Sequence, residues 1–360
     1  MSKVAKVTSG FALMQAAAST LVIRVRATQN LTKLEPFPMS TAKTVSPIQL
    51  FVDAACDVPD SYFSDNKFKV LPVTVEVGKE RYEDTREPKA TSHFHANVLT
   101  RPRAAIDGRS TPPTPTQISE FLHRHYQDAD QVIGLHVTST RSAIFTNARQ
   151  AANKMRVETY SARIRAGQTQ QIMLDCIDSL GLFAGYGAQA LEMAELAASG
   201  KSYNAVLAQV QQNAKDAYTF AAPQALEFVV ERARSKGDHS ISEFAAMAGK
   251  LLNIIPIVRC HRGETAPIGR QFGRNAARRW LIALAERQIT ERKLRSRHVV
   301  FSYSGDLSEI ESLPSFVALQ KTAKNAKVDL HLAPMSMTNA VNIGPNALSL
   351  GFIGFPPSGM

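Results

Sequence analysis

The sequence predicts an α/β protein whose first half contains a parallel sheet. Three short apolar runs, each long enough for one buried strand, are followed by hydroxyl-bearing or acidic residues and then by helical stretches. These runs are 49–53, 131–137 and 170–176. Ligands of parallel α/β sheets bind beyond the carboxyl ends of the strands. We therefore expect a ligand site at that edge of the sheet.

The segments between these strands have signatures of their own. Residues 68–77 alternate in polarity and are rich in β-branched side chains, which predicts another strand. Prolines fix φ and remove backbone donors, so the proline-rich stretch 110–115 is expected to be a rigid loop. Its Ser and Thr hydroxyls would cap a helix over 116–126. Further helices are expected over 142–152 and 185–198.

The second half also mixes helices and strands. At 360 residues the chain exceeds one average domain, so we expect two. The predicted domains are 46–200, with the parallel sheet, and 201–360, a mixed α/β domain, with a ligand cleft between them. In the second domain the expected helices are 201–217, 223–235, 241–252, 275–292 and 307–323, and the expected strands are 253–260, 298–303 and 328–332.

Composition narrows the class of protein. The net charge is 42 − 31 = +11, but no zinc-finger spacing or RNA-binding signature accompanies it, so no specific nucleic-acid binding is expected. No apolar run reaches the roughly 18 residues that span a bilayer, so no transmembrane segment is expected. The three cysteines are far apart and odd in number, which favours free thiols and a reducing cytoplasm.

The first 45 residues differ from the rest. They carry six basic residues against one acid, and the stretch after Gly10 is only moderately apolar. Arg24 lies where a secretory cleavage site should be small and neutral, which disfavours a signal peptide. Met39 begins an ordinary-looking translation start. Residues 1–38 are therefore interpreted as an artefact of start assignment or a disordered extension.

Catalytic and metal-binding signatures are sparse. The sequence has no G-x-S-x-G elbow, no Walker phosphate loop and no H-E-x-x-H. The pair His123 and His125 lies on a predicted helix, where residues i and i+2 do not share a face, and the pair His93 and His95 has the same spacing. We therefore expect no metal site and no catalytic residue.

Hydroxyls near the strand ends remain as candidate ligand donors. Each alone is commonly a helix cap. Together, with helix N-termini beside them, they would form a neutral cleft for a carboxylate or phosphate. The residues are Ser110, Thr111, Thr138, Ser139 and Ser179.

A series of short motifs spans residues 48–355 in a fixed order. The stretch 53–59 is similar to D-S-T-A-D-L-P, and 110–115 is similar to T-S-Q-P-S-P. Residues 138–145 resemble S-S-x-L-S-G-T-Y, 249–257 nearly reproduce G-x-L-L-N-I-K-P-I, and 342–346 match H-T-G-P-G in part. In this order the motifs resemble those of the DegV family of lipid-binding proteins.

The resemblance implies a two-domain α/β carrier that encloses a long-chain fatty acid between its domains and catalyses nothing itself. It implies no cofactor other than the bound fatty acid, whose carboxylate is presented to a partner fatty-acid kinase. Thr111 and Ser139 would be the head-group donors. The residues implied to bind the ligand are Ser110, Thr111, Thr138, Ser139, Arg270, Asn342 and Ile343, with Arg274 competing for the place of Arg270.

Four departures from the family pattern affect the head-group region. Asn342 stands where the family has His, and Ser240 stands where it has Arg. Ala54 and Ala55 replace Ser-Thr, and Ile255 replaces Lys. These changes remove groups that would support phosphoryl transfer, whereas the hydroxyls suited to a lipid carboxylate are retained.

Two other functions fit parts of the sequence. The hydroxyls and acids at the strand ends would also suit an enzyme or binding protein for a small acidic or phosphorylated ligand in the same cleft. The positive charge alone would suit a nucleic acid or an anionic surface. The arginine-rich helix over 275–292 is the part of the chain where such binding would be tested, although charged helix faces are usually only solvated.

Overall fold

The computed structural model describes residues 46–65, 67–167, 170–224, 226, 228–230 and 253–358. The N-terminal 45 residues, Ser240 and the helix expected over 241–252 lie outside these residues, as does most of the helix expected over 223–235. Residues from Ser46 onward form one compact unit.

The predicted parallel sheet is confirmed. Its order is β2-β1-β6-β7, and all three pairings are parallel. The strands are β1 (Gln49–Asp53), β2 (Lys69–Leu71), β6 (Gln131–His136) and β7 (Met173–Asp178). Every residue of β6 is buried, as expected for a central strand covered on both faces. At Gly134 of β6 a larger residue would not fit, because an added Cβ would come within 2.3 Å of the Phe51 ring.

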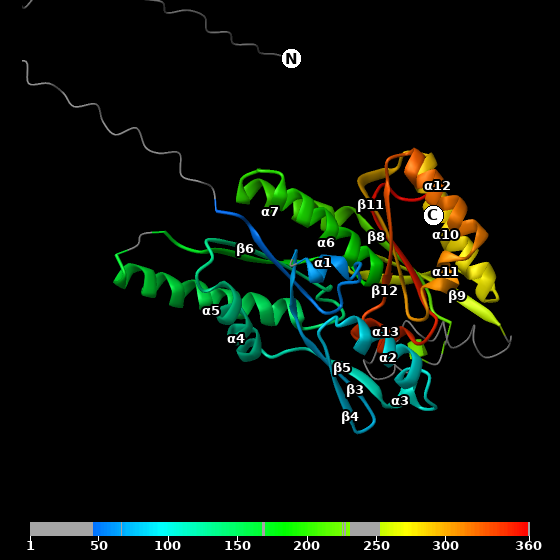
Figure 1. Cartoon of the computed structure of the whole chain (residues 1–360), viewed down its shortest axis with the longest axis horizontal. Coiled ribbons are helices and arrows are strands. Elements are labelled where there is room, and N and C mark those ends of the chain that lie inside the picture. Colours follow the sequence, from blue (N-terminus) through cyan, green and yellow to red (C-terminus); the bar gives the residue numbers. More distant parts are fainter. Residues whose placement is uncertain are drawn as a thin grey trace, which may run out of the picture. The chain divides into compact units, whose positions relative to one another are not determined.

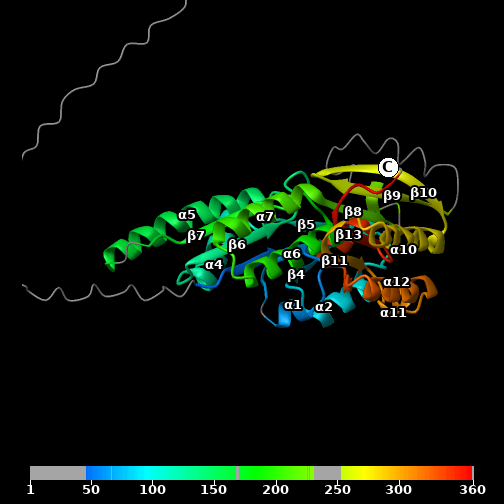
Figure 2. The same ribbon diagram turned by 90° about the horizontal axis from the view of Figure 1, so that it is seen from above.

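Helices flank this sheet. They are α4 (Pro115–Tyr126), α5 (Ile144–Arg165), α6 (Phe183–Ala198) and α7 (Tyr203–Asp216). Both views show α4, α5 and α7 grouped with the parallel strands (Figures 1 and 2). Helix α4 begins with a capping box, in which Thr114 Oγ1 accepts the Gln117 N–H at 3.3 Å. The predicted hydroxyl cap is therefore confirmed.

A second, mixed sheet has the order β10-β9-β8-β13-β11-β12. Only β11 and β12 pair in parallel. The strands are β8 (Ala217–Ala222), β9 (Ile254–His261), β10 (Glu264–Phe272), β11 (Leu294–Tyr303), β12 (Asp329–Pro334) and β13 (Leu348–Gly354). Sequence patterns predicted β9, β11 and β12 but not the other three.

Helix α6 contacts strands of both sheets, including β1 and β13. Helices α10 (Arg274–Thr290) and α12 (Pro314–Asn325) pack together on the mixed sheet (Figure 1), next to the single turn α11 (Ser308–Glu311). The predicted division near residue 200 falls between α6 and α7, and it stays a prediction. None of the helices in the described part of the chain combines the length and hydrophobicity needed to cross a bilayer.

A third sheet has the order β4-β3-β5. Two segments that contribute to it differ from the structure expected from the sequence. Its strands are β3 (Val73–Val77), β4 (Glu80–Asp84) and β5 (Gly108–Thr111). The strand expected over 68–77 is broken at Pro72, which lacks an N–H, and its halves enter different sheets. Ser110 and Thr111 lie in β5 rather than in the loop expected over 110–115.

Short helices complete this region. They are α1 (Ser61–Ser64), α2 (Pro88–His93), the π-helix η1 (Phe94–Val98), α3 (Ala104–Asp107) and α13 (Met337–Ile343). Helix α13 packs against β3 and β5. A segment close to the C-terminus therefore lies against strands from the first third of the chain.

Tyr186 of α6 connects the helix to the parallel sheet. Its hydroxyl donates to Leu135 O at 2.5 Å and accepts the Asp53 N–H at 3.2 Å, and all three residues are buried. An unpaired buried polar group costs about 1–3 kcal/mol. We therefore expect Tyr186→Phe to lower the free energy of unfolding by about that amount in urea titrations. Tyr160→Phe, at an exposed position of α5, is the control, and an equal loss in both variants would contradict the expectation.

Candidate ligand site at the carboxyl ends of the parallel strands

Side chains of helix α13 form hydrogen bonds both to the residues just after β1 and to the end of β5. Asn339 Nδ2 donates to Ala55 O at 2.8 Å, just beyond β1. Asn342 Nδ2 donates to Ser110 Oγ of β5 at 3.2 Å and to Thr338 O at 2.7 Å. Because Asn339 and Asn342 are three residues apart, they share one face of the helix. The fold thereby brings together two of the predicted ligand-binding residues, Ser110 and Asn342.

Buried charges hold α13 in this position. Asp84 Oδ2 accepts hydrogen bonds from Thr338 N at 2.8 Å and from Thr338 Oγ1 at 2.7 Å. Asp57 Oδ1 accepts from Ser336 N at 2.9 Å. Arg86 lies beside both acids, with its Nη1 3.8 Å from Asp57 Oδ1. Burial raises the pKa of Asp57 and of Asp84, and the positive charge of Arg86 opposes both increases.

These three charged residues were not among the predicted ligand-binding residues. Asp57 belonged to a quoted motif, and Arg86 was not singled out. A buried role for Arg86 has little signal in sequence, because arginine is nearly always exposed. In the structure its guanidinium also donates to Pro334 O at 2.8 Å, so the cation reaches the segment that leads into α13.

In the loop after β6, the two predicted hydroxyl residues, Thr138 and Ser139, differ in their exposure to solvent. Thr138 is fully buried, with its Oγ1 3.1 Å from Thr140 Oγ1. Thr140 Oγ1 in turn donates to Gly263 O at 2.7 Å. Ser139 is exposed, and its N–H donates to the Asp178 carboxylate at 3.2 Å. Ser139 is therefore accessible to solvent, whereas the Thr138 hydroxyl is turned into the loop.

The 138–142 loop and the proline-rich segment 110–115 both lie near the carboxyl ends of the parallel strands. Val137 N donates to Asp53 Oδ2 at 2.8 Å, which holds the 138–142 loop beside the end of β1. Asn147 Nδ2 of α5 donates to Pro113 O at 2.9 Å, which holds the proline-rich segment beside the start of α5. Among the described residues, no side-chain hydrogen bond joins Ser110 or Asn342 directly to Thr138 or Ser139.

Arg270 lies on a different part of the fold. It is exposed on β10, opposite Pro256 of β9. Gly263, which meets Thr140, is in the turn of this hairpin, seven residues before Arg270. Seven extended residues span on the order of 20 Å. Arg274 is likewise exposed, at the start of α10. A head-group role for either arginine stays a prediction.

An apolar cluster adjoins the Ser110–Asn342 pair. Ile343, the remaining predicted residue, is only 5% exposed and belongs to this cluster. The cluster is formed mainly by β3, α13 and the helical segment before β5, and it also includes Ala221 of β8 and Phe228. Its buried members include Val75, Val77, Phe94, Val98, Leu99, Met335, Met337, Ala340, Val341, Ile343 and Ala347. Ser110 and Asn342 are half-buried, so the pair forms a polar rim on an apolar interior.

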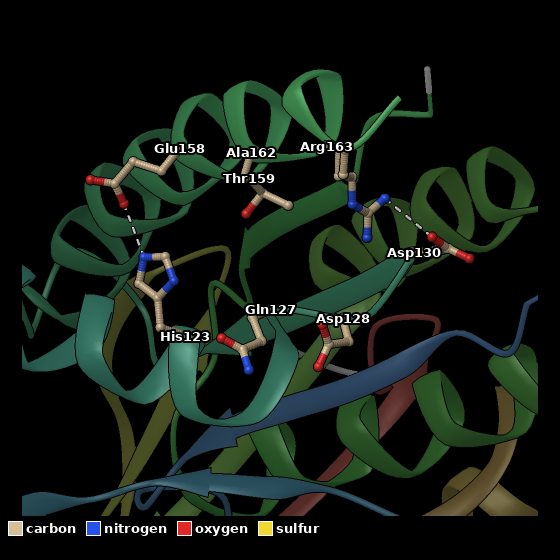
Figure 3. A pocket seen from close by; sticks show the side chains of 9 residues that line it. His123, Gln127, Asp128, Asp130, Glu158, Thr159, Ala162 and Arg163 are labelled. Atoms are coloured by element: carbon tan, nitrogen blue, oxygen red, sulfur yellow. Dashed lines mark hydrogen bonds and ion pairs between the residues drawn. The ribbon is translucent and has the colours of Figure 1, made fainter. Parts of the chain in front are cut away.

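The two members of each histidine pair, His93 with His95 and His123 with His125, have different surroundings. His123 Nε2 lies 2.9 Å from Glu158 Oε2, in a hollow of about 670 Å³ between α4 and α5 (Figure 3). His125 instead packs on Phe121, at 4.8 Å between ring centroids. His93 Nδ1 faces Asn97, and His95 is buried, which lowers its pKa to about 4.

The fold defines a class of α/β protein in which a parallel sheet and a mixed sheet share one helix and a small third sheet borders the hydroxyl segments. A family model described as "Uncharacterised protein, DegV family" matches residues 47–354. The chain belongs to the DegV family, which confirms the resemblance found in its motifs.

Relatives and solved structures agree with this assignment. A DegV domain-containing protein of Xanthomonas campestris pv. campestris is 36% identical over 313 residues, which cover 86% of this chain and 98% of that protein. The crystal structure of DegV, a fatty acid binding protein from Bacillus subtilis, matches with TM-score 0.64 at 16% identity. It covers 86% of this chain and 100% of that one.

A third similar structure is the Fatty Acid Kinase (Fak) B3 protein of Streptococcus pneumoniae, loaded with linoleic acid. It matches with TM-score 0.61 at 14% identity, over 86% of this chain and 100% of that one. At these identities the similarity of both solved structures establishes the fold, and the predicted α/β fold class is confirmed.

Proposed function

We propose that this protein binds a long-chain fatty acid and does not transform it. The observation behind the proposal is the Ser110–Asn342 pair on the rim of the buried apolar cluster. A fatty acid has the same division, with a polar head group at one end of an apolar chain. The carboxylate would lie at the rim, and the acyl chain would lie along the side chains of the cluster.

The head group would be held by neutral donors. Hydrogen bonds to a carboxylate are roughly twice as strong as bonds between neutral groups, so an entering head group can displace the Asn342–Ser110 bond. Both groups can then donate to it, one through an amide N–H and one through a hydroxyl. Asn342 supplies a donor without the charge that a histidine would supply when protonated.

Thr111 and Ser139 would complete the head-group site. Both are exposed and lie on the edge formed by β5 and the end of β6. A carboxylate bound there would remain accessible from solvent, as presentation to a separate fatty-acid kinase requires. Two solved neighbours described by their fatty acids support lipid as the ligand class.

Mass spectrometry of the purified, denatured protein tests the proposal. We expect protein isolated from its native cells to release one fatty acid per chain. The double substitution of Thr111→Ala with Ser139→Ala should lower this occupancy, because it removes two donors from the head group. The matched control is Ser161→Ala with Thr290→Ala, which removes two exposed helix hydroxyls that bond backbone oxygens at 3.0 Å.

The outcomes separate lipid binding from the enzymatic alternative. Repeated preparations that contain no fatty acid and show no thermal shift with added fatty acids would refute the proposal. A thermal shift with small phosphorylated or dicarboxylic acids alone would favour the alternative of a small acidic ligand. Equal occupancy in the test and control variants would remove Thr111 and Ser139 from the site.

A further inference from the structure

A cluster of histidine and carboxylate side chains lies at one edge of the mixed sheet, on β11 and β12. His298 of β11 is directly opposite Asp329 of β12, and His331 follows Asp329 by two residues. Residues two apart on a strand share a face, so all three side chains lie on the same side of the sheet. His298 Nδ1 is 3.1 Å from His331 Nε2 and 3.9 Å from Asp329 Oδ2.

These distances suit a shared metal ion. The three potential ligand atoms lie within 4.8 Å of one another. Two nitrogen ligands on one tetrahedral zinc, each bonded at 2.0–2.1 Å, are separated by about 3.3–3.4 Å. The two imidazole nitrogens are already almost at that spacing, so binding requires small side-chain rotations and no movement of the strands.

The second nitrogen of His298 faces carboxylates of helix α6. His298 Nε2 is 3.3 Å from Glu195 Oε1, and Glu192 belongs to the same group. The His298 side chain is only 1% exposed, and its Nε2 has no well-oriented hydrogen bond among the described residues. Metal-bound histidines almost always direct their other ring nitrogen to a carboxylate or similar acceptor, which orients the ring. Glu195 is placed for that role.

A surface hollow beside these ligands provides an approach for the ion. Asp329 and His331 line a surface hollow of about 580 Å³, through which a hydrated ion can approach.

Arg297 forms ion pairs with two carboxylates of this group. Its Nε lies 2.6 Å from Asp329 Oδ2 and 3.2 Å from Glu195 Oε1. An entering ion would compete with it for Asp329. The Arg297 side chain is 57% exposed, so it can turn toward solvent when the ion binds.

We infer that His298, Asp329 and His331 bind one divalent transition-metal ion of the zinc class, with Glu195 orienting His298. Two imidazoles and a carboxylate form a ligand set typical of zinc sites, and the fourth position would hold water. The site involves none of the residues proposed to bind the fatty acid, so it can exist whether or not a lipid is bound.

Calorimetric titration of the chelator-treated full-length protein with ZnCl₂ tests this inference. We expect one zinc ion per chain, with His331→Ala abolishing that binding. Glu195→Gln should weaken it about 10–100-fold, as loss of an outer-sphere partner typically does. Arg297→Ala should strengthen it, because the competing cation is removed. His123→Ala, at a half-exposed histidine in the hollow between α4 and α5, is the matched control and should bind as the wild type does.

Two results would overturn the inference. One is the absence of saturable zinc binding by the wild type. The other is equal zinc affinity of His331→Ala and His123→Ala. Should His331→Ala fail to fold, Arg297→Ala decides, because this exposed side chain lies outside the core. Weaker or unchanged binding by Arg297→Ala would then count against a site that includes Asp329.

Discussion

Replacing Arg86 with alanine is expected to lower the free energy of unfolding by about 3–5 kcal/mol, the range found when one partner of a buried ion pair is removed. The side chains of Arg86 and Asp57 are both 0% exposed, and Asp84 is equally buried. Without the guanidinium, two buried carboxylates lose the positive charge that opposes the rise of their pKa values. Pro334 O also loses its donor.

The same substitution should change how stability depends on pH. Burial raises the pKa of Asp57 and Asp84, and Arg86 limits the increase. A carboxyl group whose pKa is higher in the folded chain binds more protons when folded, so its contribution to stability falls as the pH rises through that pKa. In Arg86→Ala the folded pKa values rise further. The deficit relative to wild type should therefore shrink as the pH falls from neutral toward about 4, the pKa of unfolded Asp.

Urea denaturation across that pH range measures both effects. Arg109→Ala is the matched control, because Arg109 forms an exposed ion pair with Glu76 at 2.6 Å. Exposed pairs contribute about 0–1 kcal/mol, so this variant should remain close to wild type. A deficit below about 1 kcal/mol for Arg86→Ala, or one that does not change with pH, would show that the buried network does not stabilise α13 electrostatically.

The second large effect is expected from Gly351→Ala in β13. A Cβ at this position would lie 2.1 Å from the backbone C of Ala184 and 2.1 Å from the backbone N of Gly185. These atoms belong to the first turn of α6, which cannot yield as the end of a flexible side chain can. Overpacking of a core typically costs 1–3 kcal/mol, and a backbone clash should reach at least the upper end, about 3 kcal/mol.

Gly269→Ala is the control for that substitution. No atom lies within 4 Å of an added Cβ there, and the residue is exposed on β10. Thermal unfolding of the two variants should therefore differ by many degrees, with Gly269→Ala close to wild type. Similar melting temperatures would mean that α6 can move away from β13 and that the close approach is not required for stability.

Short-range sequence patterns were sufficient to predict much of the secondary structure in the first half of the chain. The run 131–137 is mostly apolar, which is typical of a strand covered on both faces, and β6 is such a strand. The cap at Thr114 was predictable because it involves a residue only three positions away. By contrast, β8 is rich in alanine and was not recognised as a strand, since alanine has little preference for strands and tertiary pairing decides the outcome.

For the candidate sites too, some features were predictable from local sequence and others depend on tertiary contacts. The hydroxyls of Ser110 and Ser139 were found from their positions near strand ends. Their surroundings could not be found, because Asn342 meets Ser110 across 232 positions of sequence. The zinc-site candidate was also missed. The histidine pairs considered from the sequence were spaced by two residues on predicted helices, where they do not share a face. Asp329 and His331 have the same spacing on a strand, where it places them on one face.

The sequence by itself determined the family, the α/β class and the parallel strands, and it predicts that hydroxyl groups bind the head group. These follow from short motifs and from periodicity, which act over a few residues. Only the tertiary structure decided that α13 lies against β5, that Arg86 is buried beside Asp57 and Asp84, and that Arg270 is exposed on β10. Those outcomes depend on which apolar faces pack together and on where buried charges find partners, and neither can be read from a few neighbouring residues.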